Sequence, residues 1–158
     1  MKILILGHKG HGKTTISRKL ALSLGLNYID TSLYIQNKVI KPYLKFAGYT
    51  KEDINNIINN KDDHRRLFYH IIAAYANPRD RLIKEVLSIS DIYTGLRSNS
   101  EYEASKYLFD HIIYVRRDNM KETDKTMLIN YNPYEMILFY NKENELNNNI
   151  NLLKEKLK

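Results

Sequence analysis

A short stretch near the start of the chain, GHKGHGKTT at residues 7–15, combines three glycines with two histidines, two lysines and two threonines. Glycine reaches backbone conformations that let consecutive N–H groups point inward around an anion. A lysine at this place can bridge phosphates as a point charge, and a threonine hydroxyl is a ligand that Mg²⁺ accepts. The stretch therefore predicts a polyphosphate-binding loop. The residues expected to bind the nucleotide there are Gly7, His8, Lys9, Gly10, His11, Gly12, Lys13, Thr14 and Thr15.

The flanking segments place this loop between a strand and a helix. Residues 3–6 form an apolar run without alternation, which predicts a short buried strand. From Ile16 to Leu24 apolar side chains recur at helical spacing, and Gly25 suits the end of that helix. The positive N-terminal end of the helix would face the anion. Strand, glycine loop and helix together identify a P-loop, which predicts that the chain binds ATP and Mg²⁺, with Thr14 as a metal ligand. The two histidines are interpreted as residues that fill the loop.

The rest of the chain alternates between short strands and helices. Further strands are expected at residues 26–30, 91–95, 111–117 and 135–140. Helices are expected at 33–46 with an interruption at Pro42, at 50–60, in two stretches between Asp62 and Ser88, at 98–109 and at 146–157. Within the region 62–88, Pro78 is expected to begin the second helix and Asn77 to cap it. The pattern predicts an α/β fold, a P-loop NTPase three-layer sandwich with a central, mostly parallel five-stranded sheet.

Composition limits the class of protein. The 158 residues suit one domain, and a hydrophobic content of 43% is that of an ordinary globular protein. The absence of cysteine excludes disulfides, a thiol nucleophile and thiolate metal sites. No apolar run is long enough for a membrane span or a signal peptide. We therefore expect a protein without a membrane partner, in the cytoplasm, or in the host cell cytoplasm if a phage encodes it.

The positive charge is concentrated in one part of the chain. Residues 1–49 carry eight Lys and Arg against the single Asp30, whereas the remaining 109 residues are balanced between the two signs. A surplus around a phosphate-binding loop suggests an electrostatic funnel for anionic substrates. Both a free nucleotide and the backbone of a nucleic acid would use such a funnel. The charge does not decide between these two partners.

Among proteins with a P-loop, the sequence favours a kinase. A regulatory GTPase would carry a guanine-reading Asn-Lys-x-Asp segment, which YNKEN at residues 140–144 fits only loosely, and a DxxG motif after a strand, which is not found. A motor ATPase would carry an acidic pair at the end of a hydrophobic strand, and no such pair is found. Phosphoryl transfer depends on neutralising charge around the γ-phosphate. Arginines at expected strand ends and helix starts can do this, namely Arg65, Arg66, Arg97, Arg116 and Arg117.

Several segments resemble the nucleoside monophosphate kinase superfamily, most of all the deoxynucleoside monophosphate kinases and related P-loop kinases of bacteriophages. The segments are GHKGHGKTT, NYIDTSLYI, DIYTGLRSNSEYEASKYLFDHIIYVRR and FYNKENEL. The resemblance implies a single kinase domain over residues 1–158, with a helical acceptor-binding insert at about 33–88 and a short lid at about 117–132. It also implies that Arg97 grips a phosphate and that Glu101 either orients this phosphate or caps the next helix. By the same resemblance, Arg117 closes the lid and Asn141 lies beside the adenine.

One feature departs from that family pattern. Many such kinases carry an aspartate that holds Mg²⁺ through water where this chain has Gly95, and Asp91 lies at the wrong end of the expected strand to replace it. Asp30, after the second expected strand, could position Mg²⁺ or act as a base toward the acceptor. It could equally be the N-cap of the following helix. The departure leaves open a catalytically inactive nucleotide-binding module.

The segment KDDHRRLFYH, together with Ser32, is the expected acceptor site. His64, Arg65, Arg66 and Tyr69 would form a basic and aromatic face, which could also be a solvated helix start. The segment resembles a group of phage P-loop kinases, some of which are linked to phosphorylating 5-hydroxymethyluracil within DNA. The acceptor is therefore expected to be a (deoxy)nucleoside monophosphate or, as the alternative, a hydroxymethylated base in DNA. The oligomeric state is not predicted.

Overall fold

The sheet at the centre of the chain has four parallel strands in the order β2-β1-β3-β4. The computed structural model describes residues 1–118, 120–121 and 125–157. The strands are Ile3–Leu6 (β1), Ile92–Thr94 (β2), His111–Arg116 (β3) and Ile137–Tyr140 (β4). The first strand lies at the centre of the sheet, because Ile3 pairs with Ile92 on one side and His111 on the other. The glycine loop therefore leaves the sheet at its middle.

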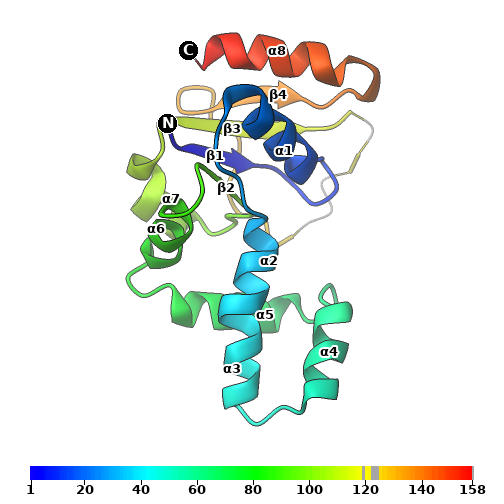
Figure 1. Cartoon of the computed structure of the whole chain (residues 1–158), viewed down its shortest axis with the longest axis vertical. Coiled ribbons are helices and arrows are strands. Elements are labelled where there is room, and N and C mark those ends of the chain that lie inside the picture. The colour runs from blue at the N-terminus through cyan, green and yellow to red at the C-terminus, as the bar shows by residue number, and fades with distance from the viewer. Residues whose placement is uncertain (119, 122–124, 158) are drawn as a thin grey trace.

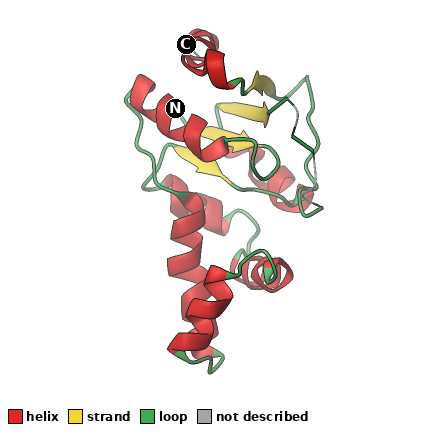
Figure 2. Ribbon diagram, turned by 90° about the vertical axis from the view of Figure 1, so that its right-hand side faces the viewer, coloured by secondary structure: helices red, strands yellow, loops and turns green. Residues whose placement is uncertain are grey.

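Helices cover both faces of this sheet and give three layers (Figures 1 and 2). Ile3 and Ile5 pack in one apolar cluster with helices α1 (Lys13–Leu24) and α8 (Leu146–Lys156). Leu4 and Leu6 point to the other face, where α6 (Arg81–Leu87) and α7 (Asn99–Ser105) contribute to the second cluster. Because successive side chains of a strand alternate between faces, an uninterrupted apolar strand is buried on both. The predicted α/β sandwich is confirmed.

The expected fifth strand is absent from the sheet, since residues 26–30 pair with no strand. Asn27 donates its backbone N–H to a carboxylate oxygen of Asp91 at 2.8 Å and accepts the Asp91 N–H at 2.7 Å. The N–H of Ile29 is directed at the Ser90 hydroxyl at 3.4 Å. Side chains that precede β2 thus satisfy the backbone groups that a strand ladder would have used. The prediction of five strands was wrong for this reason.

Between β1 and β2 the chain builds a helical insert that extends away from the sheet (Figure 1). It consists of α2 (Thr31–Ile35), a π-helical turn (Gln36–Ile40), α3 (Lys41–Phe46), α4 (Lys51–Asn59) and α5 (Arg65–Tyr75). The wide π turn directly precedes Pro42, which cannot donate a backbone hydrogen bond and crowds the preceding turn. The helix expected at 33–46 therefore continues past Pro42. Thr50 and Asp53 form the capping box that begins α4.

Two helix boundaries differ from the sequence expectation. Helix α6 begins at Arg81 after Asp80, not at Pro78, because residues 78–81 form a separate turn closed by a bond from the Arg81 N–H to the Pro78 carbonyl. Asn77 is therefore not a helix cap. Helix α7 is followed by a 3₁₀ turn at Lys106–Leu108, and another 3₁₀ turn at Glu143–Glu145 precedes α8. None of the helices in the described part of the chain is long and apolar enough to span a bilayer.

The central strand offers a test of the packing. Replacing Leu4, which is fully buried, with Ala removes side-chain volume from the cluster under the insert. We expect the free energy of unfolding to fall by about 2 to 5 kcal/mol, measured by chemical denaturation. Leu22→Ala is the matched control, because that leucine on α1 is 87% exposed, and its effect should stay within about 0.5 kcal/mol. Equal effects of the two changes would contradict the assignment of β1 to the core.

Candidate functional site

The glycine loop connects the end of β1 to the first turn of α1. Gly12 precedes the helix in a left-handed conformation with φ of 91°, and within the described residues no side-chain hydrogen bond caps this end of α1. Those N–H groups and the positive end of the helix dipole are therefore available to an anion. The Lys13 ammonium folds back over the loop and donates hydrogen bonds to the carbonyls of Gly7 at 2.7 Å and His8 at 2.8 Å. This is the geometry expected of a P-loop.

The carboxyl ends of β3 and β4 hold the loop in place. Asn141, which follows β4, is buried and donates from its side-chain amide to the His11 carbonyl at 2.9 Å. Its own N–H bonds to the Arg116 carbonyl at the end of β3 at 2.7 Å. The ring of His11 is only 1% exposed and accepts the backbone N–H of Arg117 at Nδ1, at 3.3 Å. His11 is thus a buried support of the loop, in line with its interpretation as loop filling.

Two glycines of the loop are required by close packing as well as by backbone angle. A β-carbon on Gly7 would lie 2.5 Å from the carbonyl oxygen of Val115, and one on Gly12 would lie 2.2 Å from the amide nitrogen of Asn141. Real side chains do not approach other atoms this closely. Both residues also have positive φ angles, of 137° and 91°. From the sequence, these glycines are explained by a loop that must wrap a phosphate. The structure adds a second reason, which is the close packing of the loop against β3 and Asn141.

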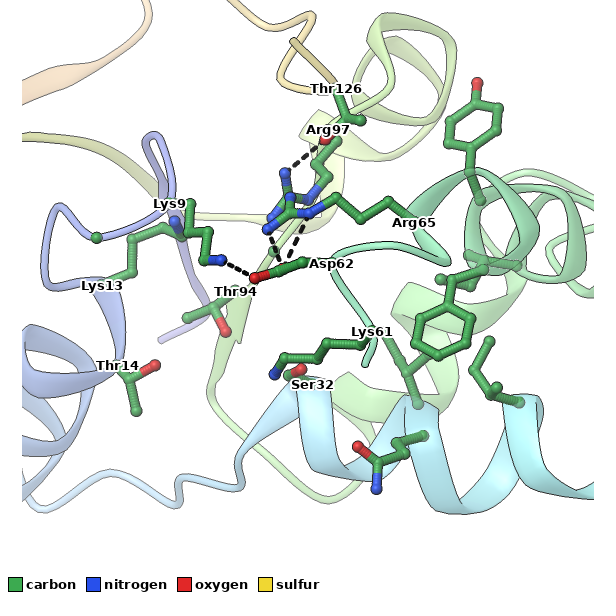
Figure 3. Close-up of a pocket in the computed structure, with 18 of the residues that line it drawn as sticks. Lys9, Lys13, Thr14, Ser32, Lys61, Asp62, Arg65, Thr94, Arg97 and Thr126 are labelled. Carbon is green, nitrogen blue, oxygen red and sulfur yellow. Dashed lines mark hydrogen bonds and ion pairs between the residues drawn. The ribbon is translucent and has the colours of Figure 1, made fainter. Parts of the chain in front are cut away.

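A cavity of about 480 Å³ lies between the P-loop, the insert and the end of β2 (Figure 3). One wall is apolar and comes from the insert, where Ile35, Ile40, Phe68 and Ile72 line it. The rest of the lining is mostly polar and includes five cationic side chains. The polar and glycine residues that line the cavity, with Tyr69, are Lys9, Gly10, Gly12, Lys13, Thr14, Ser32, Gln36, Lys61, Asp62, Arg65, Tyr69, Thr94, Gly95, Arg97 and Thr126.

The sequence-predicted nucleotide residues divide into two groups around this cavity. Those that line it are Lys9, Gly10, Gly12, Lys13 and Thr14. Those that do not are Gly7, His8, His11, Thr15 and Asn141. Gly7, His11 and Asn141 support the loop from behind through the contacts described above. A role of Asn141 toward adenine stays a prediction.

Asp62 is a cavity residue that sequence reasoning missed. Its carboxylate pairs with the P-loop side chain of Lys9 and with the guanidinium of Arg65, whose Nη2 lies 2.9 Å away (Figure 3). Hydrogen bonds from Lys9 and then Arg65 lower the pKa of Asp62 to about 2. From the sequence, Asp62 is placed at the start of a helix and is assigned no role of its own, whereas α5 begins at Arg65. Lys9 lies 53 positions before Asp62 in the chain, so no local sequence pattern indicates that the two residues meet.

Only some of the expected acceptor residues line the cavity. Arg65 and Tyr69, four residues apart on α5, both line the cavity, as does Ser32 at the start of α2. His64 and Arg66, the residues on either side of Arg65, do not line it. The predicted basic and aromatic face is therefore split along α5. The apolar partners Phe68 and Ile72 take the remaining cavity-facing positions.

Arg97 reaches the cavity from the segment after β2 and is held by the region of the expected lid. Its guanidinium donates to the hydroxyl of Thr126 at 2.7 Å, and its carbonyl accepts the N–H of Leu128 at 2.9 Å (Figure 3). Ile129 in the same segment is buried in the core. The C-terminal half of the predicted lid thus packs against the body of the chain. Residues 119 and 122–124 of that lid lie outside the described residues.

Glu101 and Arg116 lie away from the cavity. Burial raises the pKa of the Glu101 carboxyl, and nearby Arg79 opposes that rise. The guanidinium of Arg116 lies 5.9 Å from the ring centres of both Tyr114 and Tyr131, which is a cation–π arrangement. The backbone of Arg117 supports the P-loop as described above, and its predicted role toward the transferred phosphoryl group stays a prediction.

Of the two residues expected to hold Mg²⁺, Thr14 lines the cavity and Asp30 does not. Thr14 lies in the first turn of α1 and lines the cavity, so its hydroxyl suits a cation bound between phosphates. Asp30 is the N-cap of α2, because its carboxylate accepts the Leu33 N–H at 3.1 Å, and Arg18 lies 3.8 Å from it. Asp30 does not line the cavity. Among the described residues no three His, Asp or Glu side chains gather as a metal site.

The sequence is similar to one curated kinase over part of its length. No protein-family model matches the chain. A segment of 77 residues, 48% of this chain, is 40% identical to a shikimate kinase from Azobacteroides pseudotrichonymphae genomovar. CFP2. This segment covers 42% of that protein, so the chain spans less than half the length of the relative.

Two solved structures are similar over almost the whole chain, at low sequence identity. An unliganded sugar kinase from Janibacter sp. HTCC2649 aligns over 97% of this chain and 94% of its own, with a TM-score of 0.48 and 14% identity. A deoxyadenosine kinase from M.mycoides with bound dATP aligns over 99% of both chains, with a TM-score of 0.48 and 16% identity. The chain's own parallel strand order and loop geometry agree with the predicted P-loop fold.

The brace from Asn141 to the loop can be tested by mutation. Asn141→Ala leaves the His11 carbonyl without this buried donor, which should lower the free energy of unfolding by about 1 to 3 kcal/mol. We also expect weaker ATP binding by calorimetry, because the loop loses its support. Asn149→Ala is the matched control, since that amide is less buried than the amide of Asn141 and donates to the Tyr140 carbonyl at 3.3 Å. Unchanged ATP affinity in Asn141→Ala would contradict the proposed support.

Proposed function

We propose that this chain is an ATP-dependent phosphotransferase that moves the γ-phosphate to a nucleotide-type acceptor. The observation that carries the proposal is the position of the cavity, which has the P-loop and the cations of Arg65, Arg97 and Lys61 around one space. A bound triphosphate would end in that space, beside any acceptor. The similarity of about half the chain to a shikimate kinase supports the kinase class.

The roles of the P-loop residues follow from their chemistry. The N–H groups at the start of α1 would hold the β- and γ-phosphates, and Lys13 would turn from the loop carbonyls to the transferred phosphoryl group. The Thr14 hydroxyl would hold Mg²⁺, which would supply positive charge beside the phosphates. Arg97 and Arg65 would stabilise the charge that develops on the equatorial oxygens in the transition state. Arg117 would act from the lid.

A (deoxy)nucleoside monophosphate is the first candidate acceptor. The volume of about 480 Å³ lies within the range of about 300 to 1,000 Å³ that small-molecule sites occupy. The apolar wall of Phe68 and Ile72 suits a flat base, with the ring of Tyr69 beside it. The cationic side suits the monophosphate. The cavity thus offers both halves of a nucleotide a surface of matching chemistry.

A hydroxyl acceptor, such as the hydroxymethyl group of 5-hydroxymethyluracil in DNA, is the second candidate. Asp62 favours it, because its carboxylate is the only acidic side chain lining the cavity among the described residues. A carboxylate can accept a hydrogen bond from an attacking O–H, whereas it repels an acceptor phosphate. The two candidates therefore differ in what Asp62 does.

Replacing Lys13 with Ala tests the phosphotransferase itself. Wild-type protein should move label from γ-labelled ATP to an acceptor in a panel of deoxynucleoside monophosphates, hydroxymethyldeoxyuridine monophosphate and DNA containing hydroxymethyluracil. Lys13→Ala should abolish transfer while the melting temperature stays near that of the wild type. Lys19→Ala, on an outer face of the same helix, should retain activity. ATP binding by the wild type without transfer to any acceptor would instead support an inactive nucleotide-binding module.

Replacing Asp62 with Asn separates the two acceptor classes. If the acceptor is a hydroxyl, kcat/KM should fall by about 10²- to 10⁴-fold, because the hydrogen-bond acceptor of that hydroxyl is weakened. If the acceptor is a phosphate, its KM should fall, because a repulsive charge has been removed. Asp63→Asn is the matched control, since Asp63 does not line the cavity. The carboxylate of Asp62, with its pKa of about 2, stays ionised from pH 5 to 9, so the ratio between variant and wild type should not change over that range.

A further inference from the structure

The far end of the insert exposes aromatic side chains on its surface. We call residues 38–51, which include α3 and the loop to α4, the insert tip; it lies at the end of the insert remote from the sheet (Figure 1). Phe46 is 93% exposed, and Tyr43 and Tyr49 are 47% and 43% exposed. Tyr43 and Phe46 are three residues apart on α3, so their side chains are neighbours. Three aromatic side chains thus lie on the surface within seven residues.

The insert tip is also cationic. Lys38, Lys45 and Lys51 are exposed and make no ion pair within the described part of the chain. Lys41 is partly covered and donates to the side chain of Asn37 at 2.9 Å. No acidic residue occurs between Asp30 and Glu52. The acidic residues at the start of α4 are Glu52 and Asp53, and Asp53 is already occupied in the capping box with Thr50.

The other side of the helix is committed to the core. Val39, Ile40 and Leu44 are buried in the cluster that also contains residues of α4 and α5. A helix that lies in a membrane surface needs a free, continuous apolar face. Here the apolar face of the helix is packed in the core. The exposed side carries separate aromatic rings among lysines. The exposed surface therefore does not have the form of a lipid-binding helix.

We propose that the insert tip binds single-stranded nucleic acid. Non-specific single-strand sites combine cations that follow the phosphates with aromatic rings on which successive bases stack. The insert tip offers Lys38, Lys45 and Lys51 for phosphates and Tyr43 and Phe46 for bases. Bases in a duplex are already stacked on each other, so the rings favour an unpaired strand. The lysines and aromatic rings proposed for this site do not line the cavity, and the proposal stands whether or not the chain transfers phosphate.

The test measures binding of fluorescent oligothymidylate by anisotropy at several salt concentrations. Saturating inorganic tripolyphosphate is present throughout, so that the P-loop cannot contribute. Changing Lys38, Lys45 and Lys51 together to Gln should reduce the slope of log affinity against log salt by about 2, because each phosphate contact of a single strand adds about 0.7. Phe46→Ala should weaken binding by about 5- to 100-fold, with less change in the salt slope.

The control variant carries Leu152→Ala and Lys156→Gln on α8, at the opposite end of the molecule (Figure 1). Leu152 is an exposed apolar residue and Lys156 is an exposed lysine. The control therefore removes an apolar side chain and a positive charge from the surface, as the tip variants do. Its affinity should equal that of the wild type, and circular dichroism should show all variants folded. The proposal is overturned if the wild type does not bind the oligonucleotide in the presence of tripolyphosphate, or if the tip variants bind as the wild type does. Tighter binding of duplex DNA or anionic lipid vesicles than of the single strand would also overturn it.

Discussion

The close packing of the glycine loop against the ends of β3 and β4 is the constraint on which the rest of the site depends. The loop must approach the Val115 carbonyl and the Asn141 amide so closely that only glycine fits at positions 7 and 12. That approach requires β1 at the middle of the sheet, with β3 beside it and β4 one strand further out. The anion site thus depends on the strand order, because a loop that leaves an edge strand would lack this support.

The cavity depends on a second, weaker contact between distant parts of the chain. The insert meets the P-loop through the carboxylate of Asp62, which holds Lys9 on one side and Arg65 on the other. An ion pair between half-exposed groups contributes little to stability. Its consequence is positional, since it places a cation of α5 beside the phosphate loop. Arg97 is fixed from the other side by Thr126, so two arginines from different elements face the same space.

The insert uses both sides of one helix for different purposes. The π turn before Pro42 lets the chain continue as a helix, and Val39, Ile40 and Leu44 are buried in the core. The same helix carries lysines and exposed aromatic rings on its outer side. Three of the eight basic residues of 1–49, namely Lys38, Lys41 and Lys45, lie in the insert tip and not at the phosphate loop, where the sequence suggested that the surplus would act.

The sequence by itself determined the parts of this protein that depend on neighbouring residues. The apolar run of β1, the glycine spacing, the start of α1 and the Thr50 cap are local patterns, and the structure has all of them. Only the tertiary structure decided the rest. It replaced the expected strand at 26–30 with side-chain bonds from Asp91 and Ser90, made Asp30 an N-cap outside the cavity, and brought Asp62 into it. These outcomes depend on partners up to 64 residues apart, such as Asn27 and Asp91, and no local pattern encodes which distant group will satisfy a backbone N–H or a carboxylate.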